Sequence, residues 1–159
     1  MRVGLGREPD LSGLLALAAQ VEHWFGPMVD EPGFHRALTE HLRRSTALVA
    51  VADDGREIVG GLLFGPDSPT YHVDWLVVSA RVRGQGVGSA LLADALRRFV
   101  REPGTVDVVT FGADHPGAVA SGARVFYERL GFVPGEAAAP GPEGGSRQVY
   151  RRAVTPAPT

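Results

Sequence analysis

The feature that most constrains the fold of this 159-residue chain is a glycine-rich turn between a predicted strand and a predicted helix. The segment over 71–78 is rich in aromatic and β-branched residues, which favours a buried strand. Apolar residues recur at helical spacing over 89–100, which predicts an amphipathic helix. The turn over 81–88 carries three glycines at alternate positions, and glycine permits both tight turning and close approach to a ligand. This order of elements predicts an α/β fold with a ligand at the turn.

The chemistry of this turn is that of an anion site. The first amides of the following helix have no partner within the helix, and the helix dipole adds partial positive charge there. Arg83 adds a full positive charge beside Gly84, Gly86 and Gly88. Because amides and a cation converge, the turn suits a pyrophosphate. It does not match other phosphate loops, since the chain has no lysine for a Walker A loop and lacks the spacing G-x-G-x-x-G.

The rest of the chain predicts a mixed α/β domain over 1–154, followed by a flexible tail over 155–159. We expect helices over about 10–21, 32–44 and 119–130, a break over 23–27, and strands over 2–5, 47–52, 57–64, 106–111 and 148–153, with a short strand beginning at Phe132. The Pro-, Gly- and Ala-rich segment over 137–146 predicts a loop. Hairpins precede βαβ crossovers in this order, which favours a sheet with antiparallel and parallel strand pairs.

Composition argues against several classes of protein. The formal net charge of −2 is unlike that of a nucleic-acid binder, and the absence of cysteine excludes disulfides, thiolate metal sites and a cysteine nucleophile. No run approaches the roughly 20 apolar residues that span a membrane, and the first residues lack the apolar stretch of a signal peptide. These features predict a soluble cytoplasmic protein that uses no metal and binds neither nucleic acid nor membrane.

Two segments resemble the GCN5-related N-acetyltransferase (GNAT) family. Arg83-x-x-Gly86-x-Gly88 matches the signature R/Q-x-x-G-x-G/A, and residues 123–132, ARVFYERLGF, resemble the family's A-x-x-x-Y-E-x-x-G-F. The resemblance covers roughly residues 71–133, and the upstream elements follow the family's order. It implies an α/β fold whose mixed sheet has about six or seven strands, helices on both faces and splayed central parallel strands. It also implies direct transfer of an acetyl group from acetyl-CoA to an amine.

The resemblance further implies a cofactor site on both sides of the turn. The preceding strand would present backbone groups of Leu76, Val77 and Val78 to the pantetheine arm and the thioester, and an amide near Val78 would bind the oxyanion. The pyrophosphate would lie on the turn and the start of the helix, which comprise Arg83, Gly84, Gln85, Gly86, Val87, Gly88 and Ser89. The family often has asparagine after the second central strand, whereas this chain has Asp114 and His115 in a longer loop.

Catalysis would need an acid for the departing thiolate and a base for the amine. Tyr127 matches the family's tyrosine that acts as the acid. The base remains open: His72 and Asp74 lie two apart on one strand and share a face, so either could take the proton directly or through water. Other candidates are His115, Glu22 and His23.

The acceptor pocket would draw on the segment between the first two helices, because the family builds the pocket there. Glu22, Trp24 and Phe25 are the candidate contacts, and the acidic residues nearby would suit a cationic amine on a small molecule or a protein. Dimers are common in the family, so a homodimer is compatible with the resemblance. Two alternatives stay open: a non-catalytic acyl-CoA-binding regulatory module, and an acyltransferase that uses another acyl-CoA.

Overall fold

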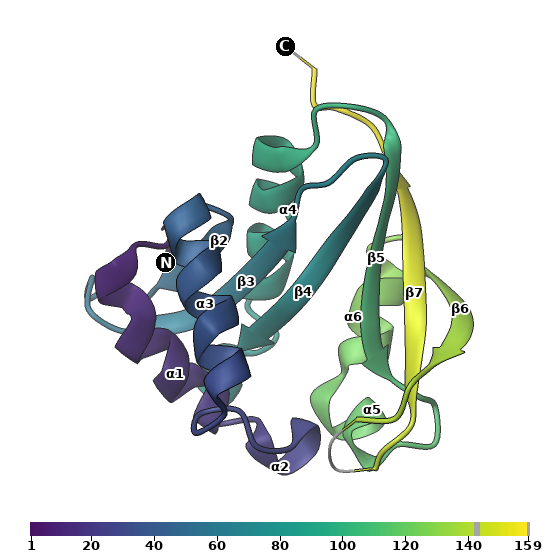
Figure 1. The fold of residues 1–159 in the computed structure, drawn as a ribbon, viewed down its shortest axis with the longest axis horizontal. Coiled ribbons are helices and arrows are strands. Elements are labelled where there is room, and N and C mark those ends of the chain that lie inside the picture. Colours follow the sequence, from purple (N-terminus) through teal and green to yellow (C-terminus); the bar gives the residue numbers. More distant parts are fainter. Residues whose placement is uncertain (142–143, 159) are drawn as a thin grey trace.

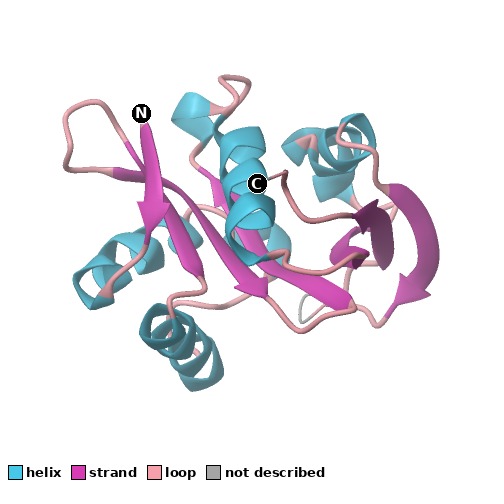
Figure 2. Cartoon of the chain, turned by 90° about the horizontal axis from the view of Figure 1, so that it is seen from above, coloured by secondary structure: helices cyan, strands magenta, loops and turns pink. Residues whose placement is uncertain are grey.

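The computed structural model describes residues 1–141 and 144–158, which form one seven-stranded mixed sheet with helices on both faces (Figures 1 and 2). The strands are β1 (Arg2–Leu5), β2 (Ala47–Val51), β3 (Ile58–Gly65), β4 (Thr70–Val78), β5 (Gly104–Phe111), β6 (Val133–Ala138) and β7 (Arg147–Val154). The helices are α1 (Leu11–Ala19), α2 (Glu22–Phe25), α3 (Pro32–Arg44), α4 (Val87–Phe99), α5 (Pro116–Ser121) and α6 (Ala123–Arg129), with 3-10 turns η1 (Glu8–Asp10) and η2 (Ala80–Val82). The strand order is β1-β2-β3-β4-β5-β7-β6, and only the β4–β5 pair is parallel within the described ranges.

Two large apolar cores, one on each face, hold most of the helices on the sheet, and a smaller third cluster lies at Leu17, Val21 and Val77. On one face, Leu91, Leu92 and Ala95 of α4 are buried together with Tyr127 of α6. On the other face, α1 and α3 pack their apolar stripes on β2 and β3, with Leu14 and Leu38 fully buried. The alternation of side chains along each strand supplies both cores, which is why one sheet can be covered on both faces. The predicted α/β sheet of six or seven strands with helices on both faces is therefore confirmed.

The central parallel strands diverge, and this divergence creates the space for a site. β4 and β5 pair only from Thr70–Val73 to Thr105–Val108, although both strands continue beyond these ranges. Figure 1 shows them meeting at the top and separating toward α2 and α5. A register shift between Leu63 and Phe64 of β3 leaves Asp74 as an extra residue in β4. Such a bulge bends its strand, so β4 turns away from β5 immediately after their last pair. The predicted splay is confirmed.

Three local predictions need correction. The helix expected over 119–130 is two helices, α5 and α6, because Gly122 adopts a left-handed conformation with φ 69°. The break expected over 23–27 contains the short helix α2. The loop expected over 137–146 begins later, because Ala137 and Ala138 pair with β7 and thereby satisfy their backbone groups; residues 142–143 of that loop lie outside the described residues. No helix among the residues described is long and apolar enough to cross a membrane.

Candidate active site

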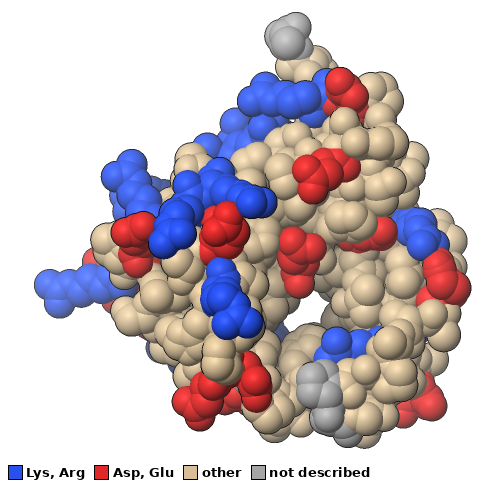
Figure 3. Space-filling model, viewed as in Figure 1, with Lys and Arg blue, Asp and Glu red and all other residues tan. Residues whose placement is uncertain are grey.

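A cavity of about 600 Å³ lies between the diverging ends of β4 and β5. Figure 3 shows an opening in the surface between the half of the molecule that carries α3 and the half that carries β5 and β7. Twelve of the residues that the sequence analysis singled out line this cavity: Trp24, Phe25, Leu76, Val77, Val78, Arg83, Gly84, Gly86, Val87, Gly88, Ser89 and Tyr127. The structure thus brings the glycine turn, the end of β4 and the start of α6 to one space. Gln85, Glu22, His72 and Asp74 are not among its lining residues.

The glycine turn forms one end of the cavity. Gly86 has φ 82°, a left-handed conformation that favours glycine, and it is the N-cap of α4. Gly88 lies in the first helical turn, where an ideal Cβ would stand 3.0 Å from the Phe126 ring. A side chain at position 88 would therefore narrow the gap between α4 and α6. Free helix amides and the neighbouring Arg83 make this end of the cavity suitable for a pyrophosphate, as the sequence predicts.

Tyr127 of α6 brings a phenol group to the cavity lining. Its side chain is 5% exposed, and its ring contacts Phe126 and Phe132 at centroid distances of 5.0 and 5.4 Å. Burial raises the pKa of the Tyr127 phenol above its usual value, because the apolar surroundings disfavour the charged phenolate. The hydroxyl is therefore protonated at neutral pH, and Tyr127 is among the residues that line the cavity.

Hydrogen bonds hold α6 in place beside the sheet. Arg124 donates to the carbonyl of Phe111 at 2.9 Å and to Oε1 of Gln148 at 2.7 Å. Tyr150 is fully buried, and its hydroxyl donates to Oε2 of Glu128 at 2.9 Å. These contacts tie the helix that carries the cavity tyrosine to the ends of β5 and β7. The position of that tyrosine thus depends on strands far from it in the sequence.

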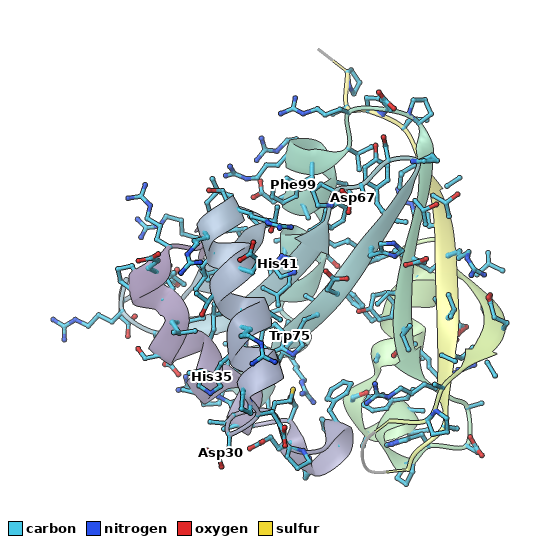
Figure 4. All side chains as sticks on the ribbon, in the orientation of Figure 1. Asp30, His35, His41, Asp67, Trp75 and Phe99 are labelled. Carbon is cyan, nitrogen blue, oxygen red and sulfur yellow. The ribbon has the colours of Figure 1, made fainter. Side chains whose placement is uncertain are left out.

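The two base candidates on β4 lie where the strands begin to separate, on the face that carries α3. His72 Nδ1 donates to the carboxylate of Asp107 on β5, the residue beside it in the parallel register. His41 of α3, labelled in Figure 4, donates from Nε2 to Oδ2 of Asp74 at 3.1 Å. Thr46 in turn donates to His41 Nδ1 at 2.7 Å. A second hollow of about 190 Å³ adjoins Asp74. Each candidate therefore has its own hydrogen-bonded partner.

The segment between α1 and α3 reaches across the cavity. The Trp24 ring lies under the Arg83 guanidinium, with 5.1 Å between Cζ and the ring centroid, and Phe25 stacks on Phe111 at 4.6 Å. Glu22 turns away from the cavity: its carboxylate accepts from the amides of Met28 at 2.6 Å and Val29 at 3.2 Å. This carboxylate closes the loop that follows α2.

His115 has a local partner of its own. Its Nδ1 accepts from the Gly117 amide at 2.8 Å, so the side chain caps α5. Its ring also contacts Phe111 at a centroid distance of 4.5 Å. His115 therefore supports the start of α5 and the end of β5.

Sequence reasoning missed several residues of this region. Phe111 and Phe126 line the cavity, and Asp107 and His41 hold the two base candidates. The only signal for Asp107 was a carboxylate between two valines in a predicted strand. Its pairing with His72 depends on the register between β4 and β5, which a single sequence does not display. In the parts of the chain that the structure describes, no group of three or more His, Asp or Glu side chains could hold a metal ion.

Comparison with known proteins places this geometry in a family. Residues 45–134, more than half of the chain, match the model of the acetyltransferase (GNAT) domain. A search of curated proteins gives no match. Many solved structures share the fold. The three described next have low sequence identity to this chain.

Three of these structures illustrate the likeness. A GNAT-family acetyltransferase from Bacillus cereus ATCC 10987 has a TM-score of 0.72 at 13% identity, with 99% of this chain and 98% of that chain covered. A ribosomal-protein-alanine N-acetyltransferase from Brucella melitensis has a TM-score of 0.69 at 19% identity, with coverages of 97% and 100%. The GNAT-like decarboxylase GphF, in complex with isobutyryl-CoA, has a TM-score of 0.71 at 22% identity, with coverages of 96% and 99%. The match to the family model, together with the glycine turn and the splayed strands, shows that this chain belongs to the GNAT acetyltransferase family.

Proposed function

We propose that this protein transfers an acetyl group from acetyl-CoA directly to an amine. One observation carries the proposal: a single cavity joins the glycine turn, with its free amides and Arg83, to the buried hydroxyl of Tyr127. This arrangement matches a ligand that has a pyrophosphate at one end and a thioester at the other. Structures that share the fold include a ribosomal-protein-alanine N-acetyltransferase and a complex with isobutyryl-CoA, which agree with acyl-CoA chemistry.

The cofactor would lie along the cavity from the turn to the end of β4. Its pyrophosphate would accept hydrogen bonds from the first amides of α4 and from Arg83. The apolar wall formed by Val78, Val87 and Phe126 suits the pantetheine arm. β4 has lost its parallel neighbour after Val73, so a ligand in the gap can meet backbone groups of Leu76 to Val78. A backbone amide near Val78 is positioned to stabilise the oxyanion of a tetrahedral intermediate.

The reaction balances with one acid and one base. The neutral amine attacks the thioester carbonyl, the N–C bond forms, and a base accepts the proton that the nitrogen loses. The C–S bond then breaks, and Tyr127 gives its proton to the departing thiolate. The tyrosinate then recovers a proton from solvent while the base releases the one it accepted, so both groups are reset and the products are the acetylated amine and CoA.

Among the base candidates, the geometry favours His72. The Asp107 carboxylate accepts from Nδ1–H, which leaves Nε2 as the basic nitrogen and stabilises the imidazolium that forms. Asp74 is the alternative, but one of its oxygens already accepts from His41. Because neither lines the main cavity, a water molecule would relay the proton from the amine.

Replacement of His72 by glutamine is expected to lower kcat by about 10²-fold, the usual size of a lost general base. Glutamine keeps a hydrogen-bonding side chain but cannot accept a proton at neutral pH. Steady-state kinetics would measure kcat, and calorimetry would show an unchanged Kd for acetyl-CoA. Asp74→Asn serves as the matched comparison on the same strand. If Asp74→Asn lost the larger share of kcat, Asp74 rather than His72 would be the base.

The acceptor is expected to be a cationic amine that enters from the face carrying α3. The hollow beside Asp74 is lined by the carboxylates of Glu40 and Asp67 and by the basic side chains of His41 and Arg44. Arg44 pairs with Glu40 and His41 with Asp74, so Asp67 is the carboxylate of the hollow that has no basic partner among the described residues. Figure 3 shows acidic side chains above the opening on this face, with basic side chains below it and to its left. The hollow carries three carboxylates against one arginine and one histidine, and this excess of negative charge favours a cationic amine. Polyamine-like and peptide amines are therefore the first acceptors to try.

Isothermal calorimetry with acetyl-CoA, followed by a panel of amines, tests the proposal. Binding in the micromolar range, about −8 kcal/mol, is expected, together with amine-dependent release of free CoA thiol. Parallel titrations with propionyl- and isobutyryl-CoA establish the preferred acyl group. Absence of acyl-CoA binding would contradict the proposal. Binding without thiol release for any amine would instead support a non-catalytic acyl-CoA-binding module.

A further inference from the structure

Arg83 has only weak polar support for its position at the turn. Its Nε donates to the carbonyl of Val78 at 3.4 Å, which is long for a hydrogen bond. Among the residues described, no carboxylate forms an ion pair with Arg83. By contrast, the neighbouring Arg81 pairs with Glu57. A long arginine side chain without a fixed partner loses considerable rotamer entropy when it binds a phosphate.

An aromatic ring supplies the missing support. The guanidinium of Arg83 lies over Trp24, with its Cζ 5.1 Å from the ring centroid, and both side chains line the cavity. Tryptophan is the best partner for such a cation–π contact. The contact uses the flat face of the guanidinium, so the N–H groups in its plane stay available for phosphate oxygens. Stacking and phosphate binding are therefore compatible.

The helix that carries this ring is held from several sides. Trp24 belongs to α2, whose N-cap Val21 is 2% exposed and packs in a small apolar core. The next residue, Phe25, stacks on Phe111 at the end of β5. Glu22 accepts two backbone amides from the loop that follows. These contacts anchor α2 across the gap, so Trp24 has a supported position beside the turn.

We infer that Trp24 is a positioning residue of the cofactor site, which holds the Arg83 guanidinium ready for the pyrophosphate of acyl-CoA. The inference rests on the proposed function and moves Trp24 from the predicted acceptor wall to the phosphate end of the cavity. Because α2 comes from the segment between α1 and α3, it also couples that segment to cofactor binding. Trp24 contributes to cofactor affinity through Arg83. This contribution therefore requires both the arginine and a phosphate on the ligand.

A double-mutant cycle measured by calorimetry tests this inference. The four proteins are wild type, Trp24→Leu, Arg83→Gln and the double variant, each titrated with acetyl-CoA and with acetyl-pantetheine, which lacks phosphate. We expect Trp24→Leu to weaken acetyl-CoA binding about three- to tenfold in the wild-type background and to have little effect when Arg83 is already glutamine. Acetyl-pantetheine should bind the wild type and Trp24→Leu equally. Trp24→Phe should retain most of the affinity, because phenylalanine still offers a ring face.

Trp75→Leu is the matched control, since it removes the other tryptophan, which packs on Phe34 at 5.7 Å rather than on the turn. The Trp75→Leu variant should have the same ratio of acetyl-CoA affinity to acetyl-pantetheine affinity as the wild type. Additive effects in the cycle would overturn the inference, as would an equal loss for acetyl-pantetheine. Tighter acetyl-CoA binding by Trp24→Leu would also overturn it, because the ring would then compete with phosphate. Failure of the wild type to bind acetyl-CoA would refute the proposed function itself, which is a separate result.

Discussion

Replacement of Tyr127 by phenylalanine is expected to lower kcat by about 10²- to 10³-fold and to leave the Kd for acetyl-CoA unchanged. Phenylalanine keeps the ring contacts with Phe126 and Phe132 but removes the only atom that can protonate the departing thiolate from this position. Pre-steady-state measurement of CoA release would report the chemical step, and calorimetry would report cofactor affinity. Loss of rate without loss of affinity is the signature of a group that acts in the transition state.

Tyr150→Phe is the control for this variant. Tyr150 is buried beside Tyr127, with 6.4 Å between the ring centroids, but it is not among the residues that line the cavity. Removal of its hydroxyl breaks the hydrogen bond to Glu128 and should cost about 1 kcal/mol in the free energy of unfolding. Its kcat should stay within about threefold of wild type. A Tyr127→Phe enzyme that retained wild-type kcat would exclude the phenol as the acid.

Tyr127 is expected to keep its proton, and with it the acid form of the enzyme, at alkaline pH. Burial raises the pKa of Tyr127 above its usual value of about 10, so the phenol keeps its proton throughout the range below pH 10. The acid form is the one that catalysis needs, and it is lost only as pH rises through the raised pKa. Ionisation of Tyr127 should therefore cause no fall in kcat between pH 7 and pH 10. Thiol-release assays across this pH range would measure kcat.

Replacement of Gly88 by valine is expected to weaken acetyl-CoA binding by at least about 100-fold while the fold persists. The new Cβ would stand 3.0 Å from the Phe126 ring and 3.6 Å from Cγ2 of Val78. The methyl groups would then fill the gap that a pantetheine arm must pass. Valine has a somewhat better helix propensity than glycine, so α4 is not weakened by the substitution itself. Calorimetry would measure the Kd, and far-ultraviolet circular dichroism would monitor the fold.

Gly33→Val provides the comparison for this second prediction. Gly33 is also helical, and an ideal Cβ there meets only the tip of the Arg36 side chain at 3.8 Å. It lies on α3, outside the cavity lining, so its affinity for acetyl-CoA should equal that of wild type. If Gly88→Val bound acetyl-CoA normally, the cofactor would have to lie elsewhere, and the assignment of the cavity between α4 and α6 would be wrong.

Local chemistry explains why much of the fold and part of the candidate site could be predicted. The turn over 81–88 has a glycine pattern that few backbones require, and both neighbouring elements have clear hydrophobic periods. Helix α3 and the strands β2 to β5 lie within a few residues of their predicted ranges for the same reason. The break at Gly122 was missed because a glycine inside an apolar helical pattern can be tolerated or can end the helix. The neighbouring elements decide which outcome occurs.

Contacts between distant segments could not be predicted in this way. The pairs His72–Asp107, His41–Asp74 and Trp24–Arg83 each join residues that are far apart in the chain. Each pair depends on strand register or on the packing of a helix across the sheet. For Trp24 and Glu22, the residue types and their segment suggested acceptor contacts, whereas the structure gives both side chains other partners.

The sequence by itself determined the α/β class, the position of the glycine turn between β4 and α4 and the segment that carries Tyr127, because these follow from local backbone preferences and hydrophobic period. Only the tertiary structure decided which side chains meet around the gap between β4 and β5. The bulge at Asp74 and the short pairing of these strands open that gap, and α2 closes over it through Trp24 and Phe25. Such contacts arise from the simultaneous packing of several elements, which a pattern in one segment does not encode.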